Sequence, residues 1–157
     1  MSQPYEELLE GDSVLRLALG ARHELICRRL HGFVGASVAN FSGTRLLAPR
    51  SRVQLAHHTF VCPDLALVTV ATGKLWLAAE IVSSDDHRHD TVVKKQLYES
   101  AKLPRLWMLD PRYDNVEVYR GGPHGLGLGG ILAGADPLTE ALLPALALRM
   151  KDLFAAA

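Results

Sequence analysis

The sequence predicts a mixed α/β (α+β) domain, and three observations support this class. Short apolar stretches rich in branched residues recur along the chain, as in residues 65–70 and 75–82, and are typical of buried strands. Two longer stretches, residues 21–38 and 90–101, carry apolar side chains at helical spacing. No repeat or shift in composition divides the chain, so we expect one domain over residues 1–157, with a sheet flanked by helices.

The N-terminal third predicts three elements. Residues 4–10, PYEELLE, predict a short helix or turn. Residues 13–19 alternate leucine with other residues, which suits a half-buried strand. Residues 21–38 predict an amphipathic helix, because their apolar side chains gather on one face: Ile26, Leu30, Phe33 and Val34.

The remaining elements follow from the same patterns. They are strands over residues 43–49, 52–61, 65–70 and 75–82, a polar loop, a helix over residues 90–101, and strands over residues 105–109 and 115–119. Residues 121–130, GGPHGLGLGG, contain the spacing G-x-G-x-x-G but do not open a helix, so we expect a hairpin and no nucleotide cofactor. The tail from residue 143 is expected to end in one amphipathic turn or short helix.

Bulk composition excludes some classes. The chain has 17 basic and 17 acidic residues, so any DNA-binding surface has to be a local patch. No apolar run is long enough for a membrane span, and the first residues lack the order of a signal peptide, which predicts a cytoplasmic protein. Cys27 and Cys62 are far apart and predict buried free thiols. His57 and His58 are expected on opposite faces of a strand, where they cannot share an ion.

Two carboxylates stand in the predicted strands. Asp64 begins one apolar strand and Glu80 lies near the end of the next, so a short turn between the strands would bring both acids to one end of the sheet. Neighbouring carboxylates repel, and one takes up a proton unless a cation lies between them. Hard oxygen ligands with room for water suit Mg²⁺, which can polarise a phosphodiester and activate a water molecule.

The helix after Glu80 adds a candidate third group. Asp90, Lys94 and Tyr98 are spaced four residues apart, so they share one helix face. Lys94 could hold the attacking water or offset charge on a phosphate. The alternative is a solvated helix face with an ordinary Asp–Lys pair, and the spacing alone leaves both interpretations open.

The order of these pieces resembles the Uma2 (DUF820) family of restriction-endonuclease-like proteins in the PD-(D/E)XK nuclease superfamily. The matching pieces are Pro63-Asp64, Glu80-Ile81-Val82-Ser83, Asp90 with Lys94 and Tyr98, and residues 107–111. Arg22-His23-Glu24 resembles the start of the family's histidine-bearing helix, and LPALALRMKDLF resembles its closing segment. The resemblance covers roughly residues 5–155.

The resemblance implies a nuclease fold, with a mixed sheet between helices and extra N-terminal strands. It implies phosphodiester cleavage with Mg²⁺, or equally Mn²⁺, held by Asp64 and Glu80. The superfamily's usual lysine position is Val82 here, so the resemblance assigns that role to Lys94, with Asp90 and Tyr98 orienting it. Two auxiliary residues are expected from the first helix, His23 and Glu24, and the rivals of Glu24 are Glu6, Glu7 and Glu10.

Two departures from the family pattern keep an alternative open. The loop Ser83-Ser84-Asp85-Asp86 replaces the family's S-P-S-T run, and Lys102-Leu103 replaces a glycine-valine pair. The resemblance as a whole leads us to expect a metal-dependent DNA endonuclease acting as a homodimer. The alternatives are an inactive module of this fold that binds DNA or a partner protein, and a hydrolase of smaller phosphoesters. Candidate phosphate contacts are Arg45, Arg50, Arg52, Arg88 and Lys95.

Overall fold

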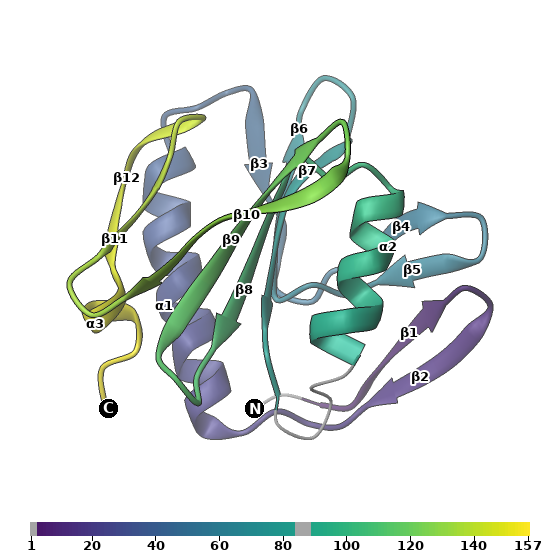
Figure 1. Cartoon of the computed structure of the whole chain (residues 1–157), viewed down its shortest axis with the longest axis horizontal. Coiled ribbons are helices and arrows are strands. Elements are labelled where there is room, and N and C mark those ends of the chain that lie inside the picture. Colours follow the sequence, from purple (N-terminus) through teal and green to yellow (C-terminus); the bar gives the residue numbers. More distant parts are fainter. Residues whose placement is uncertain (1–2, 84–88) are drawn as a thin grey trace.

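A six-stranded sheet forms the centre of the computed structural model, which describes residues 3–83 and 89–157 (Figure 1). In spatial order its strands are β10 (Gly125–Ala133), β9 (Asn115–Gly122), β8 (Arg105–Asp110), β7 (Leu75–Ile81), β6 (Leu65–Thr69) and β3 (Thr44–Leu46). Strands β7 and β8 are parallel, and the other neighbours are antiparallel. The crossover between β7 and β8 contains the π-helical turn η1 (His89–Val93) and helix α2 (Lys94–Ser100).

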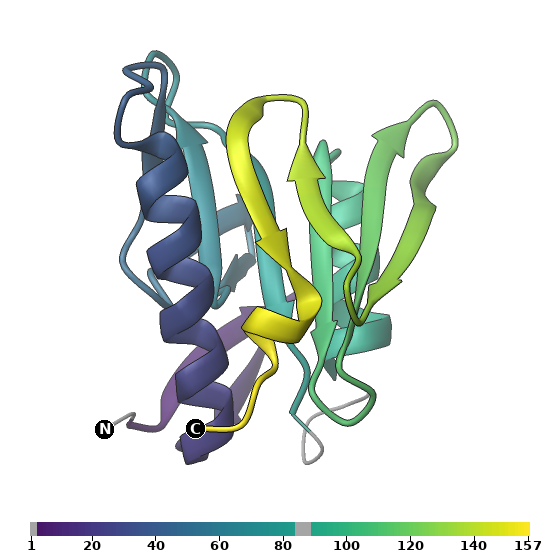
Figure 2. The same ribbon diagram turned by 90° about the vertical axis from the view of Figure 1, so that its left-hand side faces the viewer.

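Helices cover both faces of this sheet. One face packs against α1 (Ala21–Val38), the hairpin of β11 (Pro137–Glu140) and β12 (Leu143–Arg149), and α3 (Met150–Leu153). Helix α2 lies on the other face, as Figures 1 and 2 show. Successive side chains of a strand point to opposite faces, so Ala79 and Ile81 join the core on the α1 side while Ala78 joins the core on the α2 side. Glu80 alternates with them on β7 and therefore points towards α2.

A smaller, four-stranded sheet lies beside α2 (Figure 1). Its order is β2 (Asp12–Arg16), β1 (Tyr5–Leu9), β5 (Thr59–Val61) and β4 (Val53–Ala56). Its strand β5 runs into residues 62–64 and then into β6, which ties the small sheet to the central one. This connection places β1 next to the start of β6.

The helices and the central strands confirm the fold class predicted from periodicity. Helix α1 has the predicted bounds, and its residues Ile26, Leu30 and Val34 are buried while Phe33 stays exposed. Strands β6, β7, β8 and β9 form where apolar stretches predict them. No helix among the described residues is both long enough and apolar enough to cross a membrane.

Other local expectations were wrong. Residues 4–10 do not form a helix or turn, because β1 pairs with β2 through a tight turn in which Glu10 and Gly11 both have positive φ. The stretch 52–61 is the β4–β5 hairpin, and His57 and His58 lie in its turn.

The C-terminal third also contains more strand than its pattern predicts. The expected hairpin at residues 121–130 is the β9–β10 turn, but its glycines continue as strand β10. The tail ends in the short helix α3, as expected, but strand β12 precedes this helix and was not predicted. In these segments pairing with a neighbouring strand overrides local preference.

Candidate active site

Asp64 and Glu80 come together at one end of the central sheet. Asp64 stands directly before β6 and Glu80 is the second-last residue of β7, and these two strands pair with Leu65 opposite Ala79. Each carboxylate is only 3% exposed. The backbone N–H of Ile81 donates to Asp64 Oδ2 at 2.8 Å, which fixes this acid against β7.

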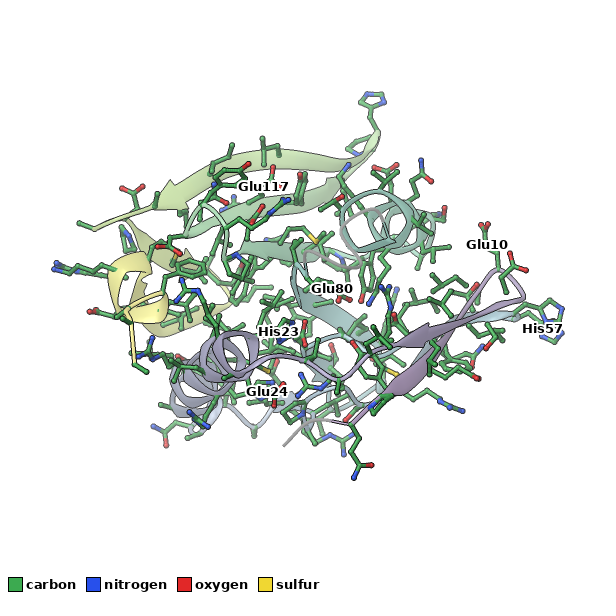
Figure 3. All side chains as sticks on the ribbon, turned by 90° about the horizontal axis from the view of Figure 1, so that it is seen from below. Glu10, His23, Glu24, His57, Glu80 and Glu117 are labelled. Carbon is green, nitrogen blue, oxygen red and sulfur yellow. The ribbon has the colours of Figure 1, made fainter. Side chains whose placement is uncertain are left out.

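Both acids line the same small cavity. It measures about 10 Å³, which is the space of about one water molecule or ion. Tyr5, Arg16 and His23 share its lining with the two carboxylates, and so do Leu19, Ile81 and Ser83. In Figure 3 His23 of α1 and Glu80 of β7, which both line this cavity, lie near one another, whereas Glu10 and His57 lie at the far end of the small sheet.

Lys94 binds two carboxylates, those of Glu80 and Glu7. Its Nζ lies 2.7 Å from Glu80 Oε2 and 2.7 Å from Glu7 Oε2, and its side chain is 1% exposed. Tyr98, one helical turn further along α2, donates its hydroxyl to Glu80 Oε2 at 2.6 Å. Burial raises the pKa of Tyr98, and the neighbouring charge of Glu80 raises it further. Tyr98 therefore acts on Glu80 directly, in contrast to its expected contact with Lys94.

Glu7 is the acid that the sequence did not single out. It was one rival of Glu24, in a segment expected to be helical, but β1 directs its side chain inward with no exposed surface. Glu7 accepts hydrogen bonds from Arg16 Nε at 2.7 Å and from the Cys62 N–H at 2.7 Å, besides the bond from Lys94. Burial raises the pKa of Glu7, but the charge of Lys94 and the hydrogen bonds outweigh it and lower the pKa below its usual value.

Asp64 has a cation of its own, Arg50. Arg50 Nη1 donates to Asp64 Oδ1 at 3.0 Å, and Nη2 donates to Glu24 Oε1 at 2.6 Å. Burial acts to lower the pKa of Arg50, but the negative charges around it, Asp64 first, outweigh this and raise the pKa. Arg50 has a φ of 58°, in the left-handed region that is rare outside glycine. Glu24 thus joins the site through Arg50.

Two histidines from α1 contact the strand ends. His23 Nε2 lies 3.0 Å from the Ile81 carbonyl oxygen and 3.6 Å from Asp64 Oδ2. His31 Nε2 lies 2.7 Å from the Asp64 carbonyl oxygen. Tyr5 completes the cavity wall, and burial together with the charge of Asp64 raises the pKa of its hydroxyl.

Four carboxylates and three permanent cations therefore make up the cluster: Glu7, Glu24, Asp64 and Glu80 with Arg16, Arg50 and Lys94. Removal of one partner from a buried ion pair leaves an uncompensated charge and costs about 3–5 kcal/mol. The acids are therefore held in place mainly by internal cations.

Few of the acids in this cluster are arranged as metal ligands. Among the described residues no three His, Cys, Asp or Glu side chains are grouped to hold a metal. Mg²⁺, however, needs only one or two protein carboxylates and keeps its waters, and Asp64 and Glu80 line one cavity of single-ion size. The carboxylates of these two residues are the ligand type that such a cation takes, but the cation would compete with Arg50 for Asp64, and its waters would need more room than this cavity has.

The structure describes only some of the other residues that the sequence suggested. The side chain of Asp90 and all of Arg88 lie outside the described residues. Lys95 points away from the acids, with its Nζ 5.0 Å from the centre of the Tyr119 ring. Cys27 and Cys62 are buried free thiols, as expected, and burial raises the pKa of Cys27 to about 12. Arg16 and Tyr5 gave no recognisable sequence signal.

Comparisons with known proteins agree with the resemblance read from the sequence. The family model described as "Uma2: Putative restriction endonuclease" matches residues 3–151. No curated protein matches the chain. The fold is similar to the crystal structure of a putative nuclease belonging to DUF820 from Anabaena variabilis ATCC 29413, with a TM-score of 0.79, 17% identity, and coverage of 96% of this chain and 90% of that chain. Since the family model spans nearly all of the sequence, the chain belongs to the Uma2 family.

Proposed function

We propose that this chain is a metal-dependent endonuclease that hydrolyses phosphodiester bonds of DNA at the Asp64–Glu80 cavity. One observation carries the proposal: carboxylates at the ends of two adjacent strands line a single-ion cavity, in a chain of the family described as "Putative restriction endonuclease". Asp64 and Glu80 would hold Mg²⁺ or Mn²⁺, which supplies a polarised phosphate and an activated water. DNA as substrate and a homodimer as the active form belong to the same proposal.

The chain's own residues would prepare this site. Lys94 and Tyr98 both bind Glu80 Oε2, so they would fix the orientation of that carboxylate. The expected role of Lys94, holding the attacking water, would need an N–H donor of its ammonium beyond the two that reach Glu7 and Glu80. Arg16 lines the cavity and would offset negative charge on the scissile phosphate.

His23 is the group best placed to move a proton. It lines the cavity, and an imidazole can both accept and donate a proton through its ring nitrogens. In the proposal His23 Nε2 exchanges its contact with the Ile81 carbonyl for one with a bound water. Glu24 and Asp90 keep auxiliary roles, Glu24 through its bond to Arg50.

A plasmid-nicking assay tests the proposal. Purified protein is incubated with supercoiled DNA and Mg²⁺ or Mn²⁺, or with EDTA, beside Asp64→Asn and Glu80→Gln. The controls are Asp152→Asn and Glu6→Gln, which make the same changes at exposed positions. We expect metal-dependent nicking that is lost in both cavity variants and kept in both controls. Nicking that survives in both cavity variants would refute the site.

A second candidate is a nuclease-fold module that binds DNA or a partner protein without cutting. The observation in its favour is that Arg50 and Lys94 already neutralise the two candidate metal ligands. Absence of nicking by the wild-type chain, with salt-dependent DNA binding that Asp64→Asn retains, would favour this candidate.

A further inference from the structure

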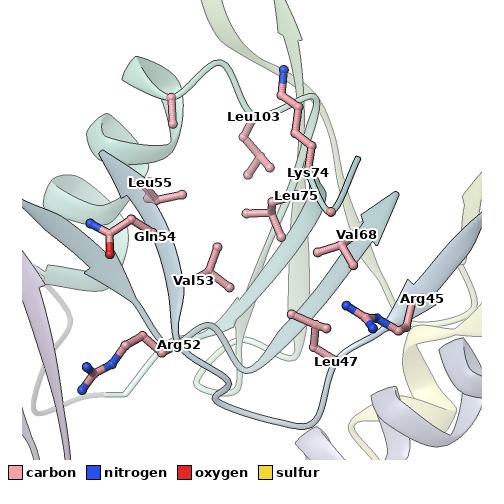
Figure 4. A pocket seen from close by; sticks show the side chains of 12 residues that line it. Arg45, Leu47, Arg52, Val53, Gln54, Leu55, Val68, Lys74, Leu75 and Leu103 are labelled. Carbon is pink, nitrogen blue, oxygen red and sulfur yellow. The ribbon is translucent and has the colours of Figure 1, made fainter. Parts of the chain in front are cut away.

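A second concave surface lies at the opposite end of the central sheet from the acids. We call it the β4 groove; it is a cavity of about 400 Å³ between β4, the β6–β7 hairpin and the end of α2 (Figure 4). Its floor is aliphatic and consists of Leu47, Val53, Leu55, Val68, Leu75 and Leu103. This volume is in the range of ligand-binding clefts in proteins.

Three cations belong to the lining of this groove: Arg45, Arg52 and Lys74. In Figure 4 the charged ends of Arg52 and Lys74 point away from the aliphatic floor, and the Arg52 guanidinium lies 3.9 Å from the centre of the Phe60 ring, which is outside the lining. All three are exposed, and among the described residues that line the groove there is no acid. No ion pair of these three cations occurs within the described part of the chain. Since the whole chain has equal numbers of acids and bases, the groove is a local excess of positive charge.

The groove also runs along the edge of a strand. Four consecutive residues, 52–55, line it, although successive side chains of a strand point to opposite faces. A surface that meets all four residues must follow the strand's edge. β4 is the last strand of the small sheet, and β3, which contains Arg45, is the last strand of the central sheet. Edge strands offer unpaired backbone groups to a partner chain.

The β4 groove is separate from the Asp64–Glu80 cavity. The two share no lining residue. Leu75 borders the groove and Glu80 borders the cavity, near opposite ends of β7, and five residues of extended strand span about 17 Å. A ligand in the groove would therefore leave the acids open.

We propose that the β4 groove binds an extended acidic peptide of a partner protein, whose backbone adds to the edge of β4. In this mode alternate side chains enter the groove, so apolar residues meet the floor and acidic residues meet Arg45, Arg52 and Lys74. A second copy of this chain is disfavoured, since a symmetric contact would set the same basic rim against itself. Nucleic acid is disfavoured because the described lining has six aliphatic side chains and no aromatic ring for base stacking.

Fluorescence anisotropy tests the proposal with the labelled peptide (Glu-Val)4. The comparison ligands are (Glu-Asn)4, which has equal charge without apolar side chains, and a 12-nucleotide single-stranded DNA. The test variant is Arg45→Glu/Arg52→Glu/Lys74→Glu. The matched control reverses three exposed cations elsewhere: Arg28→Glu/Arg149→Glu/Lys151→Glu. Circular dichroism checks that both variants keep the fold.

We expect (Glu-Val)4 to bind at least about tenfold more tightly than (Glu-Asn)4, and to lose at least about tenfold in affinity in the groove variant but not in the control. Equal binding of the two peptides, or equal loss in both variants, would overturn the proposal, as would no binding of (Glu-Val)4. If the DNA binds more tightly than the peptide and this binding depends on the same three cations, the ligand of the groove is nucleic acid and the peptide proposal is wrong. None of these outcomes depends on nuclease activity.

Discussion

Replacement of Lys94 by methionine should destabilise the fold strongly. Methionine lacks the ammonium group and has sulfur in place of the δ-methylene, so it keeps most of the unbranched apolar stem. The ammonium lies 2.7 Å from both Glu7 and Glu80, and all three side chains are at most 4% exposed. The change therefore leaves two buried carboxylates without their shared cation. From the usual cost of breaking a buried pair, we expect a loss of about 3–5 kcal/mol in the free energy of unfolding.

Urea unfolding measures this loss, with fluorescence of the buried Trp76 and Trp107 as the signal. In a chain of this length about 3–5 kcal/mol corresponds to a fall of about 6–20 °C in the melting temperature. The control is Lys95→Met at the next position, whose ammonium lies 5.0 Å from the centre of the Tyr119 ring. That contact is worth about 0.5–1 kcal/mol.

A double variant distinguishes charge from packing. If the loss comes from uncompensated carboxylates, adding Glu7→Gln to Lys94→Met should recover part of the stability, since one buried charge is then removed. The loss should also shrink at acidic pH, where the stranded carboxyl groups take up protons. A cost for Lys94→Met no greater than that for Lys95→Met would refute the reasoning. A Lys94 variant that loses nicking must therefore be shown to be folded before the loss is assigned to catalysis.

Further expectations follow from the same cluster and from one hairpin. Folding lowers the pKa of Glu7, so the stabilisation that its carboxylate gives the fold is present above the unfolded pKa of about 4.5. This stabilisation is lost as the pH falls through the folded pKa. The free energies of unfolding of the wild type and Glu7→Gln should therefore converge at that acidic pH. Folding raises the pKa of Tyr98, so stability should decline above the unfolded value of about 10, and ultraviolet titration should show this phenol ionising only with unfolding. Mg²⁺ should raise the melting temperature of the wild type but not of Asp64→Asn, and equal shifts would refute the metal site. Gly125→Ala should cost at least about 1–2 kcal/mol in urea unfolding, because Gly125 has a φ of 98° and an added Cβ would meet the carboxylate of Glu99, whereas an unchanged stability would show that the turn adapts.

The sequence determined the elements whose patterns are local. The period of apolar residues placed helix α1 at its observed bounds and located β6 and β7, which carry Asp64 and Glu80. The order of short motifs also indicated the family that the family model confirms. Local patterns suffice here because a helix or a buried strand selects its own residues at a fixed spacing.

Only the tertiary structure decided the rest of the cluster. Lys94 and Glu7 are 87 residues apart in the chain, and their contact depends on β1 joining a sheet that its own residues do not predict. Arg50 reaches Asp64 from a residue with positive φ, which no periodic pattern indicates. Pairings between distant segments are set by which surfaces meet in the folded chain. The sequence alone therefore indicated the two acids, and the fold decided which cations neutralise them.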